Sequence, residues 1–209
     1  MTTTPPRAFE PRHLQLARAL FAALAAVMVT FSPDHSAAVG LAIFSGFSIA
    51  TGLVFVLAAW LAFPAGRRAV PILLGALDLA AGMVEGVTPW RSTALFFALV
   101  ITWAAVTGLV ELLAGIRARR AALGAESPRD AMTIGVLTLV LAAGTAVVPA
   151  GYALNYSVEG AGTFTLTGTV IAVGIFGGYA AIVAVFLGIA GFSPRKDAVV
   201  ANDRTEVDA

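Results

Sequence analysis

The sequence predicts an all-α, polytopic membrane protein with six transmembrane helices arranged as three tandem helical hairpins. Three observations lead to this fold class: an apolar composition, six long apolar stretches and an internal repeat. Apolar residues make up 59% of the chain, only 12% of the residues are charged, and the mean hydropathy is +0.90. Because a soluble domain carries about a quarter charged residues, this composition favours a membrane protein.

Six apolar stretches lie between the charged runs, and each is near or above the roughly 20 residues that a helix needs to cross a bilayer. Strands of a transmembrane barrel are only about ten residues long and alternate in polarity. These stretches are continuously apolar, so each is interpreted as a helix. The predicted spans are residues 14–31, 37–63, 69–88, 93–116, 131–151 and 163–191.

An internal repeat groups the spans into pairs. Pro33 is followed nineteen residues later by Gly52, and Pro89 is followed at the same spacing by Gly108, so the two copies are offset by 56 residues. A third copy begins at Met132 and has a longer outer loop. Such self-similarity indicates a tandem arrangement. The predicted hairpins are 14–63, 69–116 and 131–191.

The first span also has the features of a secretory signal, because Arg7, Arg12 and Arg18 give it a basic leader. Its removal would take away half of the first hairpin, so it is interpreted as a retained helix with Arg18 snorkelling to the inner interface. Residues 1–13 are then a cytoplasmic segment. Residues 193–209 mix both charge signs with few large apolar side chains, and we predict a disordered cytoplasmic tail there.

The basic residues define an orientation. Eleven of the thirteen Lys and Arg residues lie in the N-terminal segment, two loops between spans and the tail, and Arg18 lies one turn inside the first span, whereas only Arg91 lies on the other side. Basic loops stay in the cytoplasm, so both termini are predicted to be cytoplasmic and the protein is placed in the inner (plasma) membrane. The turns at Pro33 and Pro89 and the segment 152–162 are then outside; for that segment a plain loop is favoured over a binding role.

Small residues spaced four apart let helices approach closely in lipid. Such pairs occur in several spans, and packing within the chain is favoured over dimerisation because an isolated match of this kind is common. The predicted helix-packing glycines are Gly46, Gly52, Gly82, Gly86, Gly108, Gly174 and Gly178.

The chain offers few groups for catalysis or metal binding. It has no cysteine, and its two histidines, His13 and His35, fall on opposite sides of the membrane, so no Cys or His metal cluster can assemble. Neither a phosphate-binding loop nor a nucleophile elbow occurs, and no basic patch reaches the size that nucleic acid requires. We therefore expect no enzyme activity, metal, cofactor or nucleic-acid partner.

Two acidic residues inside the spans form the candidate intramembrane polar site, because an ionised side chain in lipid is costly. Asp78 lies near the middle of its span and must be either protonated or paired; a functional role and a role in joining helices carry nearly equal weight. Glu111 lies nearer the inner boundary. Pairing with Arg18, or with an arginine of the 117–120 run, is favoured there over a functional role. Neither acid recurs in the other copies.

A family resemblance is carried by the segments GALDLAAG (75–82) and WAAVTGLVELLAGIR (103–117), with the turn residue Pro89 between them. They resemble the short membrane repeat of the HdeD family of bacterial acid-resistance proteins, over roughly residues 14–192 and best in the middle hairpin. The resemblance implies six spans in three hairpins and a stress-related inner-membrane protein, with no catalytic residue to carry over. The third copy departs from the pattern through its longer loop and its lack of an acidic residue in the helices.

Two functions stay open. The first is a non-enzymatic protein that supports the envelope under acid or other stress, by its presence in the lipid bilayer or through a second copy or another membrane protein. The alternative is a small transporter or proton pathway in which Asp78 loads a proton and Glu111 relays it. The first is preferred, because the sequence shows no second acid at the depth of Asp78, no basic partner beside it and no broken helix.

Overall fold

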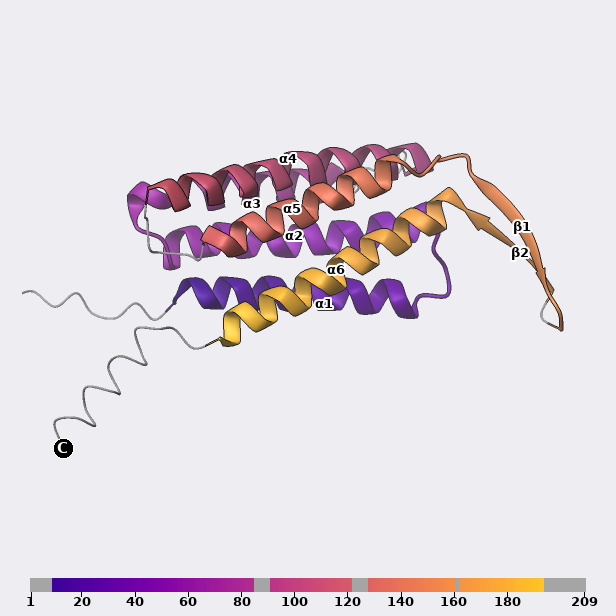
Figure 1. Ribbon diagram of the computed structural model, residues 1–209, viewed down its shortest axis with the longest axis horizontal. Coiled ribbons are helices and arrows are strands. Elements are labelled where there is room, and N and C mark those ends of the chain that lie inside the picture. The colour runs from indigo at the N-terminus through magenta and orange to yellow at the C-terminus, as the bar shows by residue number, and fades with distance from the viewer. Residues whose placement is uncertain (1–8, 85–90, 122–127, 161, 194–209) are drawn as a thin grey trace, which may run out of the picture.

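The computed structural model describes residues 9–84, 91–121, 128–160 and 162–193. Its body is a bundle of helices that lie side by side, each running opposite to the one before it (Figure 1). We call the end where the first helix begins and the last one ends the terminal end, and the opposite end, which carries two strands, the hairpin end. The elements are α1 (Pro11–Phe31), α2 (Ala37–Leu61), the short helix η1 (Ala65–Arg67), α3 (Ala69–Val84), α4 (Thr93–Arg120), α5 (Pro128–Ala146), β1 (Ala153–Val158), β2 (Gly162–Thr167) and α6 (Gly168–Phe192).

Five of these helices are long and apolar enough to span a membrane, and α3 is a shorter apolar helix of 16 residues. Continuous apolar helices of this length are those of a multi-pass integral membrane protein. The third predicted span continues to residue 88, but residues 85–90, including Gly86, lie outside the described part of the chain. The predicted tail beyond residue 193 also lies outside it.

The helices that begin at the hairpin end share one N-terminal signal. Ser36 before α2, Ser92 before α4 and Thr167 before α6 each accept a hydrogen bond from the backbone N–H three residues later. These caps satisfy an amide group that a helix start leaves without a partner. At the terminal end, α1 begins at Pro11, within the predicted N-terminal segment. Proline is favoured at this first helix position, because the backbone N–H that it lacks would have no hydrogen-bond partner in the helix.

The helices form three closely packed pairs: α2 with α3, α4 with α5, and α1 with α6. The two helices of each predicted hairpin also touch, but less extensively. A Cβ atom at Gly52 would lie 2.9 Å from the Gly75 carbonyl oxygen, and one at Gly108 would lie 3.0 Å from the Gly135 carbonyl oxygen. The backbones of α2 and α3, and of α4 and α5, are therefore in direct contact, which only glycine permits.

The predicted packing glycines divide into two groups. Gly52, Gly82 and Gly108 lie at helix contacts, since a Cβ atom at each would meet a neighbouring helix within 3.0 Å. The prediction is wrong for three others, which face open space: Gly46, Gly174 and Gly178. The spacing of small residues identifies a face of a helix but not the direction in which that face points. Close contacts that the sequence did not predict occur at Gly75, Gly115, Gly135, Gly177 and Gly191.

The segment between α5 and α6 is a β-hairpin, so its interpretation as a plain loop is wrong. The strands β1 and β2 pair antiparallel, with Tyr156 opposite Phe164, and Gly160 in the turn has a φ of 79°, in the left-handed region that favours glycine. The strands displace the predicted helix boundaries: α5 ends at Ala146 rather than at 151, and α6 begins at Gly168 rather than at 163.

Aromatic side chains from α2, α4 and α6 fill the core on the hairpin-end side of its middle. Phe44 packs edge-on against Trp103 and Phe176, with ring centroids 5.1 and 5.7 Å apart, and Phe47 contacts the same two rings. Edge-to-face packing of this kind is favourable. We call Phe44, Phe47, Trp103 and Phe176 the aromatic layer, because these four rings bound the candidate site described next.

Candidate functional site

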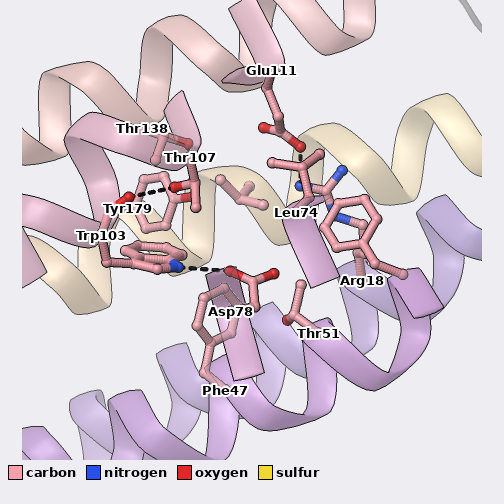
Figure 2. Close-up of a pocket in the computed structure, with 12 residues that line it drawn as sticks. Arg18, Phe47, Thr51, Leu74, Asp78, Trp103, Thr107, Glu111, Thr138 and Tyr179 are labelled. Carbon is pink, nitrogen blue, oxygen red and sulfur yellow. Dashed lines mark hydrogen bonds and ion pairs between the residues drawn. The ribbon is translucent and has the colours of Figure 1, made fainter. Parts of the chain in front are cut away.

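Asp78, Glu111 and Arg18 come together around one cavity in the middle of the bundle (Figure 2). They project from α3, α4 and α1, respectively. The cavity has a volume of about 20 Å³, which is room for one water molecule. The two predicted site acids therefore belong to a single cluster, together with the arginine of the first span.

Arg18 and Glu111 form a direct ion pair. The Arg18 Nη2 atom donates a hydrogen bond of 2.7 Å to Glu111 Oε1, and the two side chains are only 15% and 7% exposed. The Arg18 guanidinium also lies over the Phe55 ring, 4.4 Å from its centroid, in a cation–π contact. The pairing expected for Glu111 is confirmed. The snorkelling predicted for Arg18 is wrong, because Glu111 and Phe55 give the guanidinium partners inside the bundle.

Asp78 is joined to α4 by a hydrogen bond in which Trp103 Nε1 donates to Asp78 Oδ1 at 2.6 Å. Asp78 is 3% exposed, and Arg18 and Glu111 both lie within electrostatic range of it. The cavity thus holds the second acid and the basic neighbour that the sequence did not show. Trp103 was not among the predicted site residues. Its spacing is the signal that would have found it, since Trp103, Thr107 and Glu111 recur every four residues along one face of α4.

Hydroxyl groups complete the lining of the cavity. Thr138 of α5 and Tyr179 of α6 share a hydrogen bond of 2.9 Å, and Thr107 donates to the Trp103 carbonyl oxygen at 2.6 Å. The buried Thr51 hydroxyl makes no hydrogen bond within the described part of the chain. A buried hydroxyl without a partner is costly, and a water molecule in the adjacent cavity would provide one.

A larger cavity, of about 360 Å³, lies between the terminal end of the bundle and the ion pair. We call it the vestibule; its walls come from all six helices of the bundle and from the α2–α3 connection. The vestibule and the central cavity share four lining residues, Arg18, Phe55, Leu74 and Glu111. The ion pair therefore forms the boundary between the two cavities.

The aromatic layer bounds the central cavity on its other side. Phe47 and Trp103 line the cavity itself, and their ring centroids are 5.9 Å apart in an edge-on contact. Tyr179 packs edge-on against Trp103 as well, with centroids 6.3 Å apart. Arg18 and Glu111 of the charged cluster thus line the vestibule, and packed rings lie between the cluster and the hairpin end.

This arrangement can hold a proton. Arg18 is balanced by Glu111, so Asp78 is the member of the cluster whose charge has no counter-ion of its own. One proton on Asp78 takes the cluster from a net negative charge to neutrality. The electrostatic energy of the cluster changes more with this proton than it would in water, because the dielectric constant inside the bundle is low. Nowhere in the described ranges do three His, Asp or Glu side chains gather in the way a metal ion requires.

The fold and the cluster together define a multi-pass membrane protein with buried charges at the centre of its helix bundle. No protein-family model, no curated protein and no solved structure matches this chain. Its function is therefore inferred from the geometry and chemistry of the cluster.

Proposed function

We propose that this chain is a non-enzymatic membrane protein that binds and releases protons at Asp78, as a small proton pathway or proton-coupled transporter. The observation that carries the proposal is the shared cavity of Asp78, Glu111 and Arg18, which adjoins the vestibule. Charged groups in a membrane interior are expensive, and they mark ion and proton routes. The sequence favours the stress-support function over a proton pathway, because it shows neither a second acid at the depth of Asp78 nor a base beside it. Glu111 and Arg18 line the same cavity as Asp78, and we therefore prefer the proton pathway.

The proposed setting is the inner membrane, with six spans in three repeated hairpins and both termini in the cytoplasm. The distribution of basic residues supports this orientation, since Arg67 and Arg117 are among the residues that line the vestibule. The caps Ser36 and Ser92 support the repeat, because they are offset by the same 56 residues as the proline turns. With this topology the vestibule faces the cytoplasm, and Asp78 exchanges protons with that side.

The resemblance to the HdeD family supplies a physiological role, the response to acid stress. A carboxylate that is reached from the cytoplasm gains a proton as the cytoplasm acidifies. The cluster then loses its negative charge, and the helices that meet at it, α1, α3 and α4, are the elements on which that change acts.

A second candidate function is structural, and the hydrogen bond from Trp103 to Asp78 favours it. Bonds of this kind hold membrane helices together, and here the bond joins α3 to α4. On this alternative the protein supports the envelope by its presence in the bilayer, or through a second copy or another membrane protein. Asp78 then only accepts a hydrogen bond and never exchanges a proton.

Proton flux into liposomes distinguishes the two functions. The chain is reconstituted around a pH-sensitive dye, a pH gradient is applied, and the wild type is compared with Asp78→Asn. Asparagine keeps an acceptor oxygen for Trp103 but cannot exchange a proton, so this variant should fold normally and lose the flux. Glu159→Gln, which changes an exposed acid in the β-hairpin turn, is the control and should keep the flux. No flux in the wild type would leave the structural function as the better account, and flux that persists in Asp78→Asn would contradict the assignment of proton exchange to Asp78.

A further inference from the structure

The β-hairpin sorts its side chains into two chemically different faces. Successive residues of a strand point to opposite faces. The register pairs apolar residues with apolar residues, and polar residues with polar residues, across the two strands. Leu154 lies opposite Leu166, and Tyr156 lies opposite Phe164. We call this side of the hairpin the apolar face; its members are Leu154, Tyr156, Val158, Phe164 and Leu166.

The opposite face is polar and uncharged. Thr165 donates a hydrogen bond of 2.6 Å to the Asn155 side-chain oxygen, and the hydroxyls of Ser157 and Thr163 lie 3.3 Å apart. Neither β1 nor β2 contains an acidic or basic residue. The hairpin is therefore amphipathic without using charge, which distinguishes it from an ordinary soluble surface.

The apolar face is exposed to the surroundings of the protein. Leu154, Tyr156, Val158 and Phe164 are between 45% and 48% exposed. The Tyr156 and Phe164 rings stack on each other, with centroids 5.9 Å apart. An isolated two-stranded hairpin is marginally stable in water, and a contiguous exposed apolar patch marks an interaction surface. This face is therefore built for contact with an apolar partner.

The base of the hairpin is fixed at the level of the helix ends. Thr167 ends β2 and caps α6, and the Gly168 N–H donates a hydrogen bond of 2.9 Å to the Tyr152 carbonyl oxygen. From this base the hairpin bends away from the long axis of the helices (Figure 1). A strand of six residues reaches about 20 Å, and the bend carries the hairpin sideways as well as outward from the helix ends (Figure 1).

We propose that the apolar face lies on the lipid at the membrane surface and that the polar face points to water, so that the hairpin anchors α5 and α6 at the interface. Tyrosine and other aromatic side chains are favoured at this depth. The uncharged strands avoid the cost of bringing a charge to the lipid. The open edges of a two-stranded sheet need water, so the hairpin stays among the headgroups and does not enter the hydrocarbon.

Because the chain contains no cysteine, single-cysteine variants can test this proposal directly. Leu154→Cys on the apolar face and Asn155→Cys on the polar face form a matched neighbouring pair, and Leu166→Cys with Thr165→Cys repeats the comparison on β2. Each variant is labelled with a nitroxide and reconstituted in phosphatidylethanolamine–phosphatidylglycerol liposomes. Collision rates are then measured with oxygen, which concentrates in lipid, and with a water-soluble nickel chelate present on both sides of the membrane.

The expected result is an alternation with a period of two residues, in which positions 154 and 166 collide at least several-fold more with oxygen, relative to nickel, than positions 155 and 165. Equal nickel access on both faces would mean that the hairpin stands in water and would overturn the proposal. Exclusion of both reagents from the apolar face, or spin–spin broadening between labels, would also overturn it, because a protein partner or a second copy would then cover that face.

A second measurement does not depend on the labels. Phe164→Trp should increase quenching of tryptophan fluorescence by brominated lipids above the level of the three native tryptophans, whereas Thr163→Trp should not. Equal quenching in the two variants would contradict the proposed orientation of the hairpin.

Discussion

Arg18 and Glu111 are separated by 93 residues in the sequence and by 2.7 Å in the structure. The ion pair joins α1 to α4, two helices that are not among the closely packed pairs of the bundle. It therefore spans the centre of the molecule, between the vestibule and the cavity that holds Asp78.

Removal of one member of this ion pair should be strongly destabilising. Arg18→Met leaves the Glu111 carboxylate buried without its partner, at a cost of about 3–5 kcal/mol in the free energy of unfolding. The double variant Arg18→Met/Glu111→Leu replaces both charges by apolar side chains and should recover most of that loss. Unfolding in mixed micelles measures both quantities. A double variant no more stable than Arg18→Met would show that the ion pair is not the source of the effect.

The bond between Trp103 and Asp78 should contribute a smaller amount. Asp78→Leu removes the acceptor and should lower the free energy of unfolding by about 1 kcal/mol, whereas Asp78→Asn should change it little. Trp103→Phe combined with each variant completes a double-mutant cycle, in which the coupling energy isolates the bond. A coupling energy near zero would remove the support that this bond gives to the structural function.

Gly52 should tolerate no side chain, because its backbone touches that of α3. A methyl group there would lie 2.9 Å from the Gly75 carbonyl oxygen and 3.0 Å from the Leu79 backbone nitrogen, so Gly52→Ala must push α2 and α3 apart. We expect a loss of about 1–3 kcal/mol in the free energy of unfolding. Gly46→Ala lies on the same helix with open space at its Cβ position, and it is the matched control, for which no loss is expected. Alanine favours a helix more than glycine does, so similar losses in both variants would mean that a general effect of the added methyl group, and not the contact with α3, decides the outcome.

The orientation of the chain can be checked with the same cysteine-free background. Cysteines at Ala125 and Thr205 should react with a membrane-impermeant reagent only after the cytoplasmic side is opened, whereas cysteines at His35 and at Ser157, on the polar face of the hairpin, should react in intact cells. Labelling of Thr205→Cys from outside would contradict both the proposed topology and the cytoplasmic opening of the vestibule.

Two features of the structure have a recognisable signal in the sequence, the β-hairpin and the face of α4 that lines the central cavity. The alternation of Leu154, Tyr156 and Val158, followed after a glycine-containing turn by Phe164 and Leu166, is a hairpin signal. The predicted span 163–191 takes in Phe164 and Leu166, which leaves only the first strand in the segment that is interpreted as a plain loop. The spacing of Trp103, Thr107 and Glu111 is also visible in the sequence and places the three side chains on one face of a helix. The sequence does not say which helix packs against that face.

The sequence by itself determined the class of protein and the approximate extent of most helices, because both depend on local composition and chain length: a continuous apolar run must satisfy its backbone hydrogen bonds as a helix in lipid. Only the tertiary structure decided which side chains meet. In a membrane the lipid is as apolar as the protein core, so hydropathy does not say which face of a helix points inward. The rotation of each helix therefore decided that Arg18 meets Glu111, that Trp103 meets Asp78, and that Gly52 packs against α3 while Gly46 does not.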